Sequence, residues 1–489
     1  MPGDRPDVVC IVADDLGWRD LGCYGSPFYE TPTLDRLARE GTRFTDAYAA
    51  SPVCSPTRAS VMTGNYPARV GVTDWIDFWG ETHPARGKLV DASYADHLPH
   101  DETTLATALG DAGYATRHVG KWHLGGEDQD SRPDDRGFDE NVAGCEWGAP
   151  VGSGGYFRPW EIPTLDESGE PDDRYLPNRL ADEAVAAIEE LGDGDDPFFL
   201  HYAPYLVHTP LQAPADLVAK YERKRAALGL DATEEFELGD RFPTEHKCDE
   251  RIRRRLVQSD PVYAAMVETL DRCVGRVCEA VERAGTAEDT VVVFTSDNGG
   301  LSTAEGSPTT NLPLSEGKGW MAEGGNRVPL IVRWPGVTDD AAPALVETPV
   351  TSPDLYATVL DAAGVPVPDG QGVDGESLRA LLRRSDGGLD RDALFWHYPH
   401  YGNQGGTPAA AVRTGRWKLV EFFESDHVEL YDLDTDVREA RDLSDDRTET
   451  VDGLRERLHA WLDDVGATFP SENPGYEPWP DRAGPYGSE

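Results

Sequence analysis

Two pairs of oxygen-bearing side chains follow the two most apolar segments of the chain. Asp14 and Asp15 close PDVVCIVADD, and Asp297 and Asn298 follow TVVVFTS. Both segments are typical of buried parallel strands, whose carboxyl ends meet in the crevice where open α/β sheets bind ligands. Either pair alone could be a polar strand cap. Together, three carboxylates and one amide oxygen favour a Ca²⁺ or Mg²⁺ site over a zinc site.

Four basic side chains lie near predicted strand ends or in glycine-flanked loops. They are Lys121 and His123 in VGKWHLG, His208 in YLVHTPLQAP and Lys318 in EGKGW. Each alone could be a packing or surface residue, but the chain has only seven lysines. Lys121 and His123 are two residues apart, so in extended backbone both side chains leave the same face. A cationic cluster beside a metal site indicates a bound tetrahedral oxyanion such as phosphate or sulfate.

The elements that must position these residues alternate between strand and helix up to about residue 385. The pattern predicts an α/β fold, in which helices cover both faces of a large, mostly parallel central sheet. The predicted helices include 31–41, 101–113, 260–284 and 352–364, and the predicted strands include 6–13, 114–120, 197–204, 290–296 and 327–336. The polar segments 125–175 and 229–258 are interpreted as irregular insertions around a site or at the surface.

The pattern changes after residue 385. Short strands in DALFWHYP, AAAVRTGRWKLVEFF and HVELYDLDTD precede a helix near 449–464. This order predicts a smaller α+β subdomain with an antiparallel sheet and one helix. We therefore expect a main α/β domain over 1–385, which carries the chemistry, and a C-terminal subdomain over 386–489, which contributes to the substrate pocket.

The net charge of −45 argues against binding to nucleic acid or to an anionic membrane. Acidic residues are spread along the chain and lysine is scarce, a pattern typical of halophiles that accumulate salt, although an ordinary acidic protein is the alternative. No apolar run approaches the ~20 residues that cross a bilayer. No basic and apolar leader precedes the first strand, so we expect a cytoplasmic protein. Seven cysteines without a CxxC pair indicate free thiols in a reducing compartment.

The segment SPVCSPTRASVMTG places Cys54 at the start of a predicted helix, with Pro56 in its first turn and Gly64 past its end. With Arg58 two residues after Pro56, the segment resembles the C-x-P-x-R…TG motif of type I sulfatases in the alkaline-phosphatase-like superfamily. The resemblance runs over nearly the whole chain. It implies that a formylglycine-generating or sulfatase-maturing enzyme converts Cys54 to formylglycine.

The same resemblance implies a role for each residue of the crevice. A metal, usually Ca²⁺ with Mg²⁺ as the alternative, is expected on Asp14, Asp15, residue 54, Asp297 and Asn298. The sulfate pocket is expected to be lined by Arg58, Lys121, His123, His208 and Lys318.

The implied chemistry uses both hydroxyls of the hydrated aldehyde at residue 54. One hydroxyl attacks sulfur, with its pKa lowered by the metal and Arg58 and with Asp297 as the candidate base. The metal and the two lysines of the pocket stabilise the sulfuryl oxygens. His208 is the candidate acid for the leaving alcohol. His123 then deprotonates the second hydroxyl, which expels sulfate and restores the aldehyde.

The segment FWHYPHYGNQGGTPAAAVRTGRWKLVEFFE is similar to the C-terminal part of carbohydrate-directed sulfatases, including galactose and N-acetylgalactosamine sulfatases. Aromatic residues interleaved with His, Asn and Gln suit sugar recognition, although the same segment could be an edge of the subdomain core. A sulfated carbohydrate or a small sulfate ester is therefore the expected substrate. The candidate sugar contacts are His397, His400, Tyr401, Asn403 and Gln404, with Asp74, Trp75 and His83 from the loop after the cysteine motif.

Two other functions fit the same residues. A phosphonate monoester or phosphodiester hydrolase would share the metal and the nucleophile. A non-catalytic protein that binds sulfated glycans would result if Cys54 were not oxidised. Substrate panels separate the first alternative, and the mass of the peptide that carries residue 54 separates the second.

Overall fold

An eight-stranded sheet runs through the computed structural model, which describes residues 5–77, 87–338, 344–383 and 388–476. Neighbouring strands are parallel except at the two pairs that involve β11, so the predicted mostly parallel sheet is confirmed. In sheet order the strands are β12 (Ala344–Val346), β2 (Thr42–Phe44), β11 (Leu330–Arg333), β10 (Thr290–Ser296), β1 (Asp7–Ala13), β7 (Phe198–Ala203), β5 (Ala115–Gly120) and β6 (Glu140–Val142).

Strand β11 departs from the expected alternation because it runs antiparallel to β10. No helix that crosses the sheet connects the two strands. Residues 297–329 form loops and the short helix α8 (Glu323–Asn326) at the end of the sheet where β10 finishes. The chain therefore returns in the opposite direction, and this connection carries Lys318.

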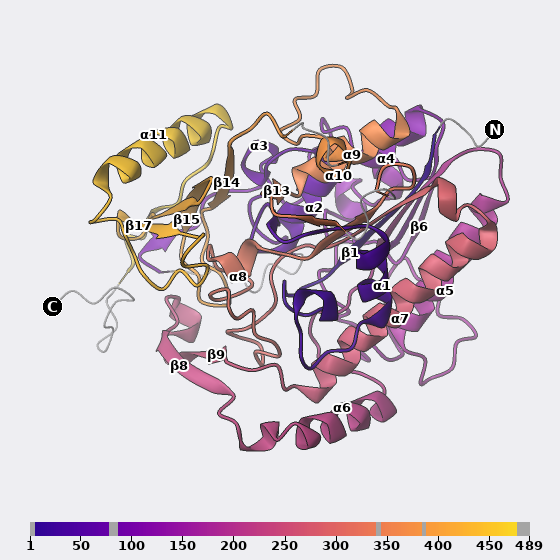
Figure 1. Cartoon of the computed structure of the whole chain (residues 1–489), viewed down its shortest axis with the longest axis horizontal. Helices are drawn as coiled ribbons and strands as arrows, with labels where there is room; N and C mark the ends of the chain where they lie inside the picture. The colour runs from indigo at the N-terminus through magenta and orange to yellow at the C-terminus, as the bar shows by residue number, and fades with distance from the viewer. Residues whose placement is uncertain (1–4, 78–86, 339–343, 384–387, 477–489) are drawn as a thin grey trace.

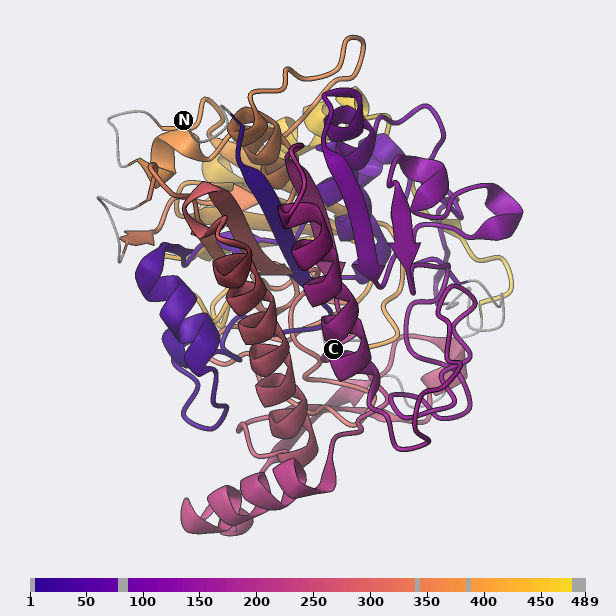
Figure 2. The same ribbon diagram turned by 90° about the vertical axis from the view of Figure 1, so that its right-hand side faces the viewer.

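Successive residues of β1 face two different helical layers. Val9 and Ile11 belong to a core with α1 (Pro32–Glu40), α5 (Leu176–Gly192) and α7 (Pro261–Ala284). Val8 and Cys10 belong to a core with α2 (Cys54–Thr63), α4 (Leu105–Asp111) and α9 (Pro353–Ala363). Figure 2 shows α5 and α7 side by side over one face of the sheet. A strand with both faces covered needs apolar residues at every position, which explains the run VVCIVA.

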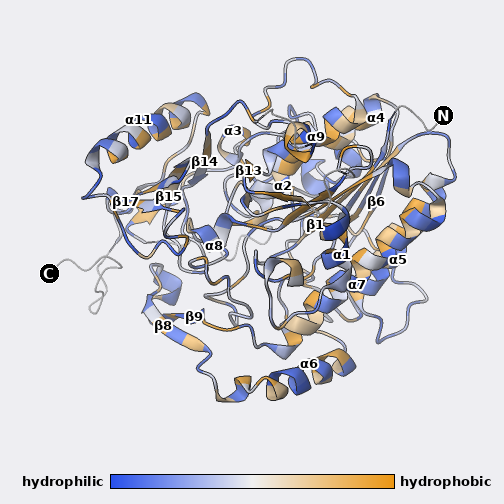
Figure 3. Ribbon diagram, viewed as in Figure 1, coloured by the Kyte–Doolittle hydropathy of each residue, from blue (hydrophilic) through white to orange (hydrophobic). Residues whose placement is uncertain are grey.

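Local signals fix the ends of the helices. The side chain of Asp260 caps α7 by accepting hydrogen bonds from the backbone N–H groups of Val262 and Tyr263, and Thr104 caps α4 in the same way. Such caps each contribute about 1 kcal/mol to helix stability. Figure 3 shows hydrophilic and hydrophobic residues alternating along α5 and α7, as expected for helices with one buried side.

The C-terminal region forms the predicted antiparallel sheet with one helix. Its strands follow chain order: β14 (Ala393–Tyr398), β15 (Ala409–Thr414), β16 (Trp417–Phe422) and β17 (His427–Asp432). One face packs on α11 (Thr448–Asp464), as Figure 1 shows. The other face carries Trp396 and Val420 against Tyr48 and Val53 of the main sheet's loops. Val53 directly precedes Cys54, so this small sheet supports the cysteine motif.

The expectation of irregular structure fails within 125–175, which contains strand β6 of the main sheet, and it is also wrong for 229–258. This segment contains a hairpin of β8 (Phe236–Arg241) and β9 (Arg251–Arg255). Its sequences FELGDR and RIRRR lack the apolar alternation that predicts a strand. The hairpin is held instead by guanidinium groups, since those of Arg253 and Arg255 lie 4.1 and 4.5 Å from the ring centre of Phe236.

The remaining short elements lie around these layers. Helix α6 (Ala215–Ala227) lies beside α7, and two small pairs are β3 (Ala47–Tyr48) with β13 (Val350–Thr351) and β4 (Leu89–Val90) with β18 (Ser471–Glu472). The short helices α3 and α10 cover Pro67–Val70 and Arg379–Leu382. Within the described residues, every helix is too short or too polar to span a membrane.

Candidate active site

The two acidic pairs meet as the sheet topology requires. β1 and β10 are neighbours in register, so Asp14-Asp15 and Asp297-Asn298 leave the same end of adjacent strands. The backbone N–H of Asp15 donates to Oδ1 of Asp297 at 3.1 Å. All four residues are at most 1% exposed. The chain therefore concentrates three carboxylates in one buried place.

The chemistry of this cluster fits a divalent cation. Burial and the neighbouring carboxylates hold the pKa of Asp14 well above its usual range, because the three acids repel one another in a low dielectric. Oδ1 of Asn298 is buried and has no hydrogen-bond partner among the described residues. Ligand atoms of Asp14, Asp15 and His208 lie within 4.8 Å of one another. An oxygen-rich cluster with a spare buried carbonyl is suited to a hard metal ion.

Three cationic side chains surround the carboxylates. Nζ of Lys121 lies 2.8 Å from both oxygens of Asp14, and Nζ of Lys318 lies 2.8 Å from both oxygens of Asp15. Nε and Nη2 of Arg58 both donate to Oδ2 of Asp297, at 2.9 and 2.7 Å. These positive charges outweigh burial and lower the pKa values of Asp15 and Asp297, so both remain ionised.

Cys54 occupies the first turn of α2 at the base of this cluster. The turn is fixed by the hydroxyl of Thr57, which accepts from the backbone N–H of Ser51, and α2 ends at Gly64 in the left-handed conformation. Cys54 is 3% exposed, and burial raises its pKa above the usual thiol value. The side chain is therefore a neutral thiol, which is a poor nucleophile in its present form.

His123 has the tautomer required of a base. Its Nε2 lies 2.9 Å from the carbonyl oxygen of Ile76, which can only accept, so Nε2 carries the proton. Its Nδ1 is then an acceptor, 3.3 Å from Sγ of Cys54. Burial and the charge of Lys121 hold the pKa of His123 well below its usual range, so the ring is neutral. With φ at +59°, His123 does not continue the strand, yet both it and Lys121 enter the site.

His208 lies on the opposite side, in contact with Lys318. Its Nε2 is 3.0 Å from Nζ of Lys318 and 3.6 Å from Oδ2 of Asp15. Burial and the charge of Lys318 lower the pKa of His208 to about 4. The structure thus brings together every residue predicted for the metal and oxyanion sites.

A cavity of about 190 Å³ opens above Cys54. Three of the predicted sugar contacts, Trp75, Asn403 and Gln404, line it together with His123, His208 and Lys318. His83 lies outside the described residues.

Four other predicted sugar contacts are not among the residues that line this cavity. The fully buried Asp74 accepts hydrogen bonds from the Tyr398 hydroxyl and from its neighbour's backbone N–H. Nε2 of His400 lies 2.9 Å from the Thr73 hydroxyl, and the Tyr401 hydroxyl accepts from the backbone of residue 89. His397 Nε2 lies 2.7 Å from the carbonyl oxygen of residue 468. Asp74, His400 and Tyr401 therefore join the subdomain to the main domain, whereas His397 bonds within the subdomain.

Sequence reasoning missed several lining residues. The cavity is also bounded by Asp77, Glu146, Trp147 and Glu305. Residues 146–151 lie in the polar segment 125–175 that was interpreted as an insertion around a site. That interpretation was the only indication in the sequence that this loop borders the cavity. A Cβ atom on Gly148 would lie 2.5 Å from Cε1 of His123, so this loop packs directly on the imidazole.

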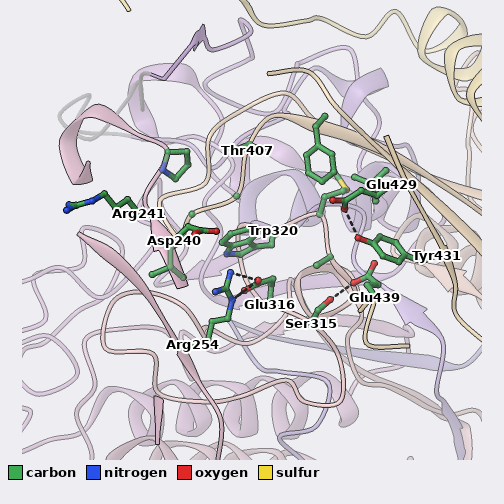
Figure 4. Close-up of a pocket in the computed structure, with 18 residues that line it drawn as sticks. Asp240, Arg241, Arg254, Ser315, Glu316, Trp320, Thr407, Glu429, Tyr431 and Glu439 are labelled. Carbon is green, nitrogen blue, oxygen red and sulfur yellow. Dashed lines mark hydrogen bonds and ion pairs between the residues drawn. The ribbon is translucent and has the colours of Figure 1, made fainter. Parts of the chain in front are cut away.

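A second cavity of about 250 Å³ lies behind one wall of the first. Figure 4 shows Trp320 at its centre, with Arg254 paired to Glu316, Ser315 to Glu439 and Glu429 to the Tyr431 hydroxyl. Gly405, Gly406 and Thr407 line this cavity, whereas Asn403 and Gln404 line the other. The indole N–H of Trp320 lies 3.1 Å from the carbonyl oxygen of Gln404. The second cavity therefore backs the segment that borders the candidate site.

Comparisons with known proteins agree with this geometry. The model of the sulfatase family matches residues 6–365, and the model of the C-terminal part of N-sulphoglucosamine sulphohydrolase matches residues 317–466. A sulfatase of Formosa agariphila is 31% identical and aligns with 94% of this chain and 89% of its own. The N-acetylgalactosamine-6-sulfatase of Canis lupus familiaris is 30% identical and aligns with 84% of this chain and 71% of its own.

A solved structure gives the same result for the fold. Ps i-CgsB in complex with k-i-k-neocarrahexaose superimposes with a TM-score of 0.72 and 28% identity, over 97% of this chain and 95% of the other. These matches confirm the fold and the resemblance that the cysteine motif indicated. The chain is a member of the sulfatase family and a sulfuric ester hydrolase.

Proposed function

We propose that this protein removes sulfate from monoesters on a sulfated carbohydrate of the galactose or N-acetylgalactosamine type, using a formylglycine made from Cys54 and a bound Ca²⁺. The observation that carries the proposal is the position of residue 54. Its Sγ lies 3.3 Å from the unprotonated Nδ1 of His123, on the wall of the cavity and beside the acidic cluster. A neutral buried thiol does little there, whereas a hydrated aldehyde would offer two hydroxyls.

The first step is attack of one hydroxyl of residue 54 on sulfur, which forms an O–S bond and breaks the bond from sulfur to the sugar oxygen. A divalent cation on Asp14, Asp15, residue 54, Asp297 and Asn298 would supply positive charge to the reacting oxygens. Arg58 keeps Asp297 ionised, so that Asp297 can take the hydroxyl proton.

The leaving sugar oxygen needs a proton, for which His208 is the proposed donor. The negative charge of the bound sulfuryl group favours protonation of the His208–Lys318 pair, whose nitrogens lie 3.0 Å apart. Lys121 and Lys318 stabilise the sulfuryl oxygens from the floor of the site.

Release of sulfate relies on His123. Its Nδ1 accepts the proton of the second hydroxyl at residue 54, the C–O bond to the sulfate breaks, and the aldehyde is restored. The hydrogen bond from Nε2 to the Ile76 carbonyl oxygen holds the imidazole in the required tautomer. This step avoids attack of water on an unreactive sulfate ester.

The carbohydrate assignment is supported by the names of the similar proteins and by the lining of the cavity. One relative is an N-acetylgalactosamine-6-sulfatase, and one solved neighbour holds neocarrahexaose. Two indoles, Trp75 and Trp147, line the cavity with the amides of Asn403 and Gln404. Aromatic faces pack on the C–H faces of sugars, and amides bond to hydroxyls.

The decisive experiment is mass spectrometry of the peptide that carries residue 54, combined with sulfate release from galactose and N-acetylgalactosamine sulfates. We expect formylglycine at residue 54 and release of sulfate. Cys54→Ser should form the covalent sulfate ester and turn over hardly at all, whereas Cys248→Ser, in the hairpin, should behave as the parent protein. Multiple turnover by Cys54→Ser at the parent rate would refute the mechanism.

Two controls separate the alternatives. A panel of sulfate monoesters, phosphonate monoesters and phosphodiesters tests the proposed ester class, and preferred hydrolysis of a phosphonate or diester would overturn it. An intact thiol at residue 54 in native protein, with sulfated glycan bound but unchanged, would favour a binding protein.

The acidic composition supports a high-salt setting as part of the proposal. With a net charge of −45, the folded chain repels itself, and salt screens this repulsion. We expect the melting temperature to rise when KCl is increased from 0.1 to 2 M. Over this range the Debye length falls from ~10 Å to below ~3 Å, so the repulsion between surface carboxylates is screened. A melting temperature that is independent of salt would argue for an ordinary acidic protein.

A further inference from the structure

The mouth of the active-site cavity is acidic. Three carboxylates line it, from Asp77, Glu146 and Glu305. Among the described lining residues, the only lysine or arginine is Lys318. The charges that this described lining places around a bound sugar are therefore negative, apart from Lys318 on the side that receives the sulfate.

Two of these carboxylates, Glu305 and Glu146, lie on opposite kinds of surface, one exposed at the rim and one nearly buried in the wall. Glu305 is exposed at the rim, where its Oε1 accepts from Nε2 of Gln404 at 2.8 Å and its Oε2 lies 3.5 Å from the Thr209 hydroxyl, next to His208. Glu146 is only 9% exposed, and its carboxylate lies against Gly126, where an added Cβ would clash with its Oε2. The loop that follows Glu146 packs on His123, so Glu146 belongs to the wall beside residue 54.

The described cations of the site are all paired with its buried carboxylates. Arg58 and Lys121 are bound to Asp297 and Asp14 on the floor, and Lys318 is bound to Asp15. A second anionic group on the same sugar, or on its neighbour, would meet the carboxylates of the mouth, where the described lining offers no further lysine or arginine to pair with it. Like charges placed together at an interface discriminate strongly against the wrong partner.

We propose that Glu146 and Glu305 are specificity-determining residues, which restrict this enzyme to sugars whose single negative charge near the scissile bond is the sulfate being removed. The inference rests on the proposed function and narrows its substrate class. Neutral galactose or N-acetylgalactosamine units with one sulfate are accepted, while an adjacent second sulfate or uronate is rejected. The two indoles and the amide side chains of the cavity suit such an uncharged ring.

The test compares N-acetylgalactosamine 4-sulfate, 6-sulfate and 4,6-disulfate, and the matching galactose sulfates, on protein that carries formylglycine. We expect kcat/KM for the disulfates to be about ten-fold or more below that of the better monosulfate, because several like charges each disfavour binding by a few-fold. Raising NaCl from 0.1 to 1 M should narrow this ratio, since screening weakens the repulsion.

The carboxylates are tested by Glu146→Gln and Glu305→Gln, singly and together. The double variant should bring the ratio of monosulfate to disulfate to within about three-fold, mainly by improving the disulfate. Glu279→Gln is the matched control, because Glu279 is exposed near the end of α7 that lies away from the site. Its ratio should equal that of the parent protein.

The outcomes separate the two proposals. Equal turnover of monosulfates and disulfates by the parent protein, or no change of the ratio in the double variant, overturns the specificity inference and leaves the sulfatase function intact. Absence of sulfate release from every ester refutes the proposed function. In that case calorimetric titration of the same sugars into Cys54→Ala still tests the inference, which requires tighter binding of the monosulfates.

Discussion

Replacing Lys418 by methionine removes one charge from a buried network between the two sheets. Nζ of Lys418 lies 3.0 Å from Glu323 and 2.8 Å from Glu439, and its side chain is 1% exposed. Ion pairs among the described residues of this network join three carboxylates to three cations, so its charges balance. Its members are Asp46, Glu323 and Glu439 with Arg327, Arg413 and Lys418.

The expected loss of stability follows from this balance. Lys418→Met leaves one uncompensated negative charge among groups that are almost fully buried, and breaking a buried pair in this way costs about 3–5 kcal/mol. At roughly 2.1 cal/mol/K per residue over 489 residues, this is a fall in melting temperature of about 3–5 °C if the chain melts as one unit. Glu439→Gln in the same chain restores the balance and should recover most of the loss.

The dependence on pH has a definite sign. Burial raises the pKa of Glu439 even with Lys418 present, and removing Lys418 raises it further. A carboxyl whose pKa is higher in the folded than in the unfolded protein lowers the free energy of unfolding when it is ionised. This destabilisation is present above the folded-state pKa and decreases as the pH falls through that pKa. The destabilisation by Lys418→Met should therefore be smaller at pH 5 than at pH 8.

Differential scanning calorimetry at the two pH values measures this effect. Lys88→Met is the control, because Lys88 is exposed and its loss should change stability by less than about 0.5 kcal/mol. A melting temperature for Lys418→Met equal to that of Lys88→Met would refute the argument from charge balance. So would a failure of Glu439→Gln to restore stability.

Three further predictions concern catalysis. His123→Ala should slow turnover by about 10²–10⁴-fold, and mass spectrometry should detect one SO₃ group that remains on residue 54. A loss of rate without that adduct would show that His123 does not act in the release of sulfate. Asn298→Leu should weaken Ca²⁺ binding in calorimetric titration by about 10-fold or more, because a buried ligand oxygen is lost; unchanged affinity would exclude it from the metal site. Trp320→Leu should raise KM several-fold with a smaller change in kcat, because Gln404 loses its anchor; an unchanged KM would contradict this.

The meeting of the two acidic pairs could be predicted from the sequence because the strand topology brings them together. Two apolar runs that each end in an acidic pair are forced into neighbouring positions once both belong to one parallel sheet. Cys54 could be placed because a proline in the first turn and a glycine past the end delimit its helix. In each case the signal is local and the geometry follows from the fold.

The sugar-facing side of the cavity could not be predicted in the same way. Glu146 and Glu305 lie on loops without periodicity, and only packing against His123 and hydrogen bonding to Gln404 bring them to the cavity. His397 and His400 were predicted to contact the sugar because they alternate with aromatic residues in FWHYPHY. In the structure the His397 side chain bonds to residue 468 of the same subdomain, and the His400 side chain, just after β14, lies 2.9 Å from the Thr73 hydroxyl of the main domain.

The support of Val53 by the C-terminal sheet has a consequence for how the chain matures during synthesis. The face that packs on Val53 and Tyr48 is built from residues 394–420, which leave the ribosome long after residue 54. At ~5–20 residues per second, translation of the intervening segment takes roughly 20–70 s. During that interval the cysteine segment lacks its final covering, so the modifying enzyme of the proposed function would reach a thiol that is only 3% exposed in the finished protein. On the proposed function, strands β14 to β16 would close the period in which residue 54 can be altered.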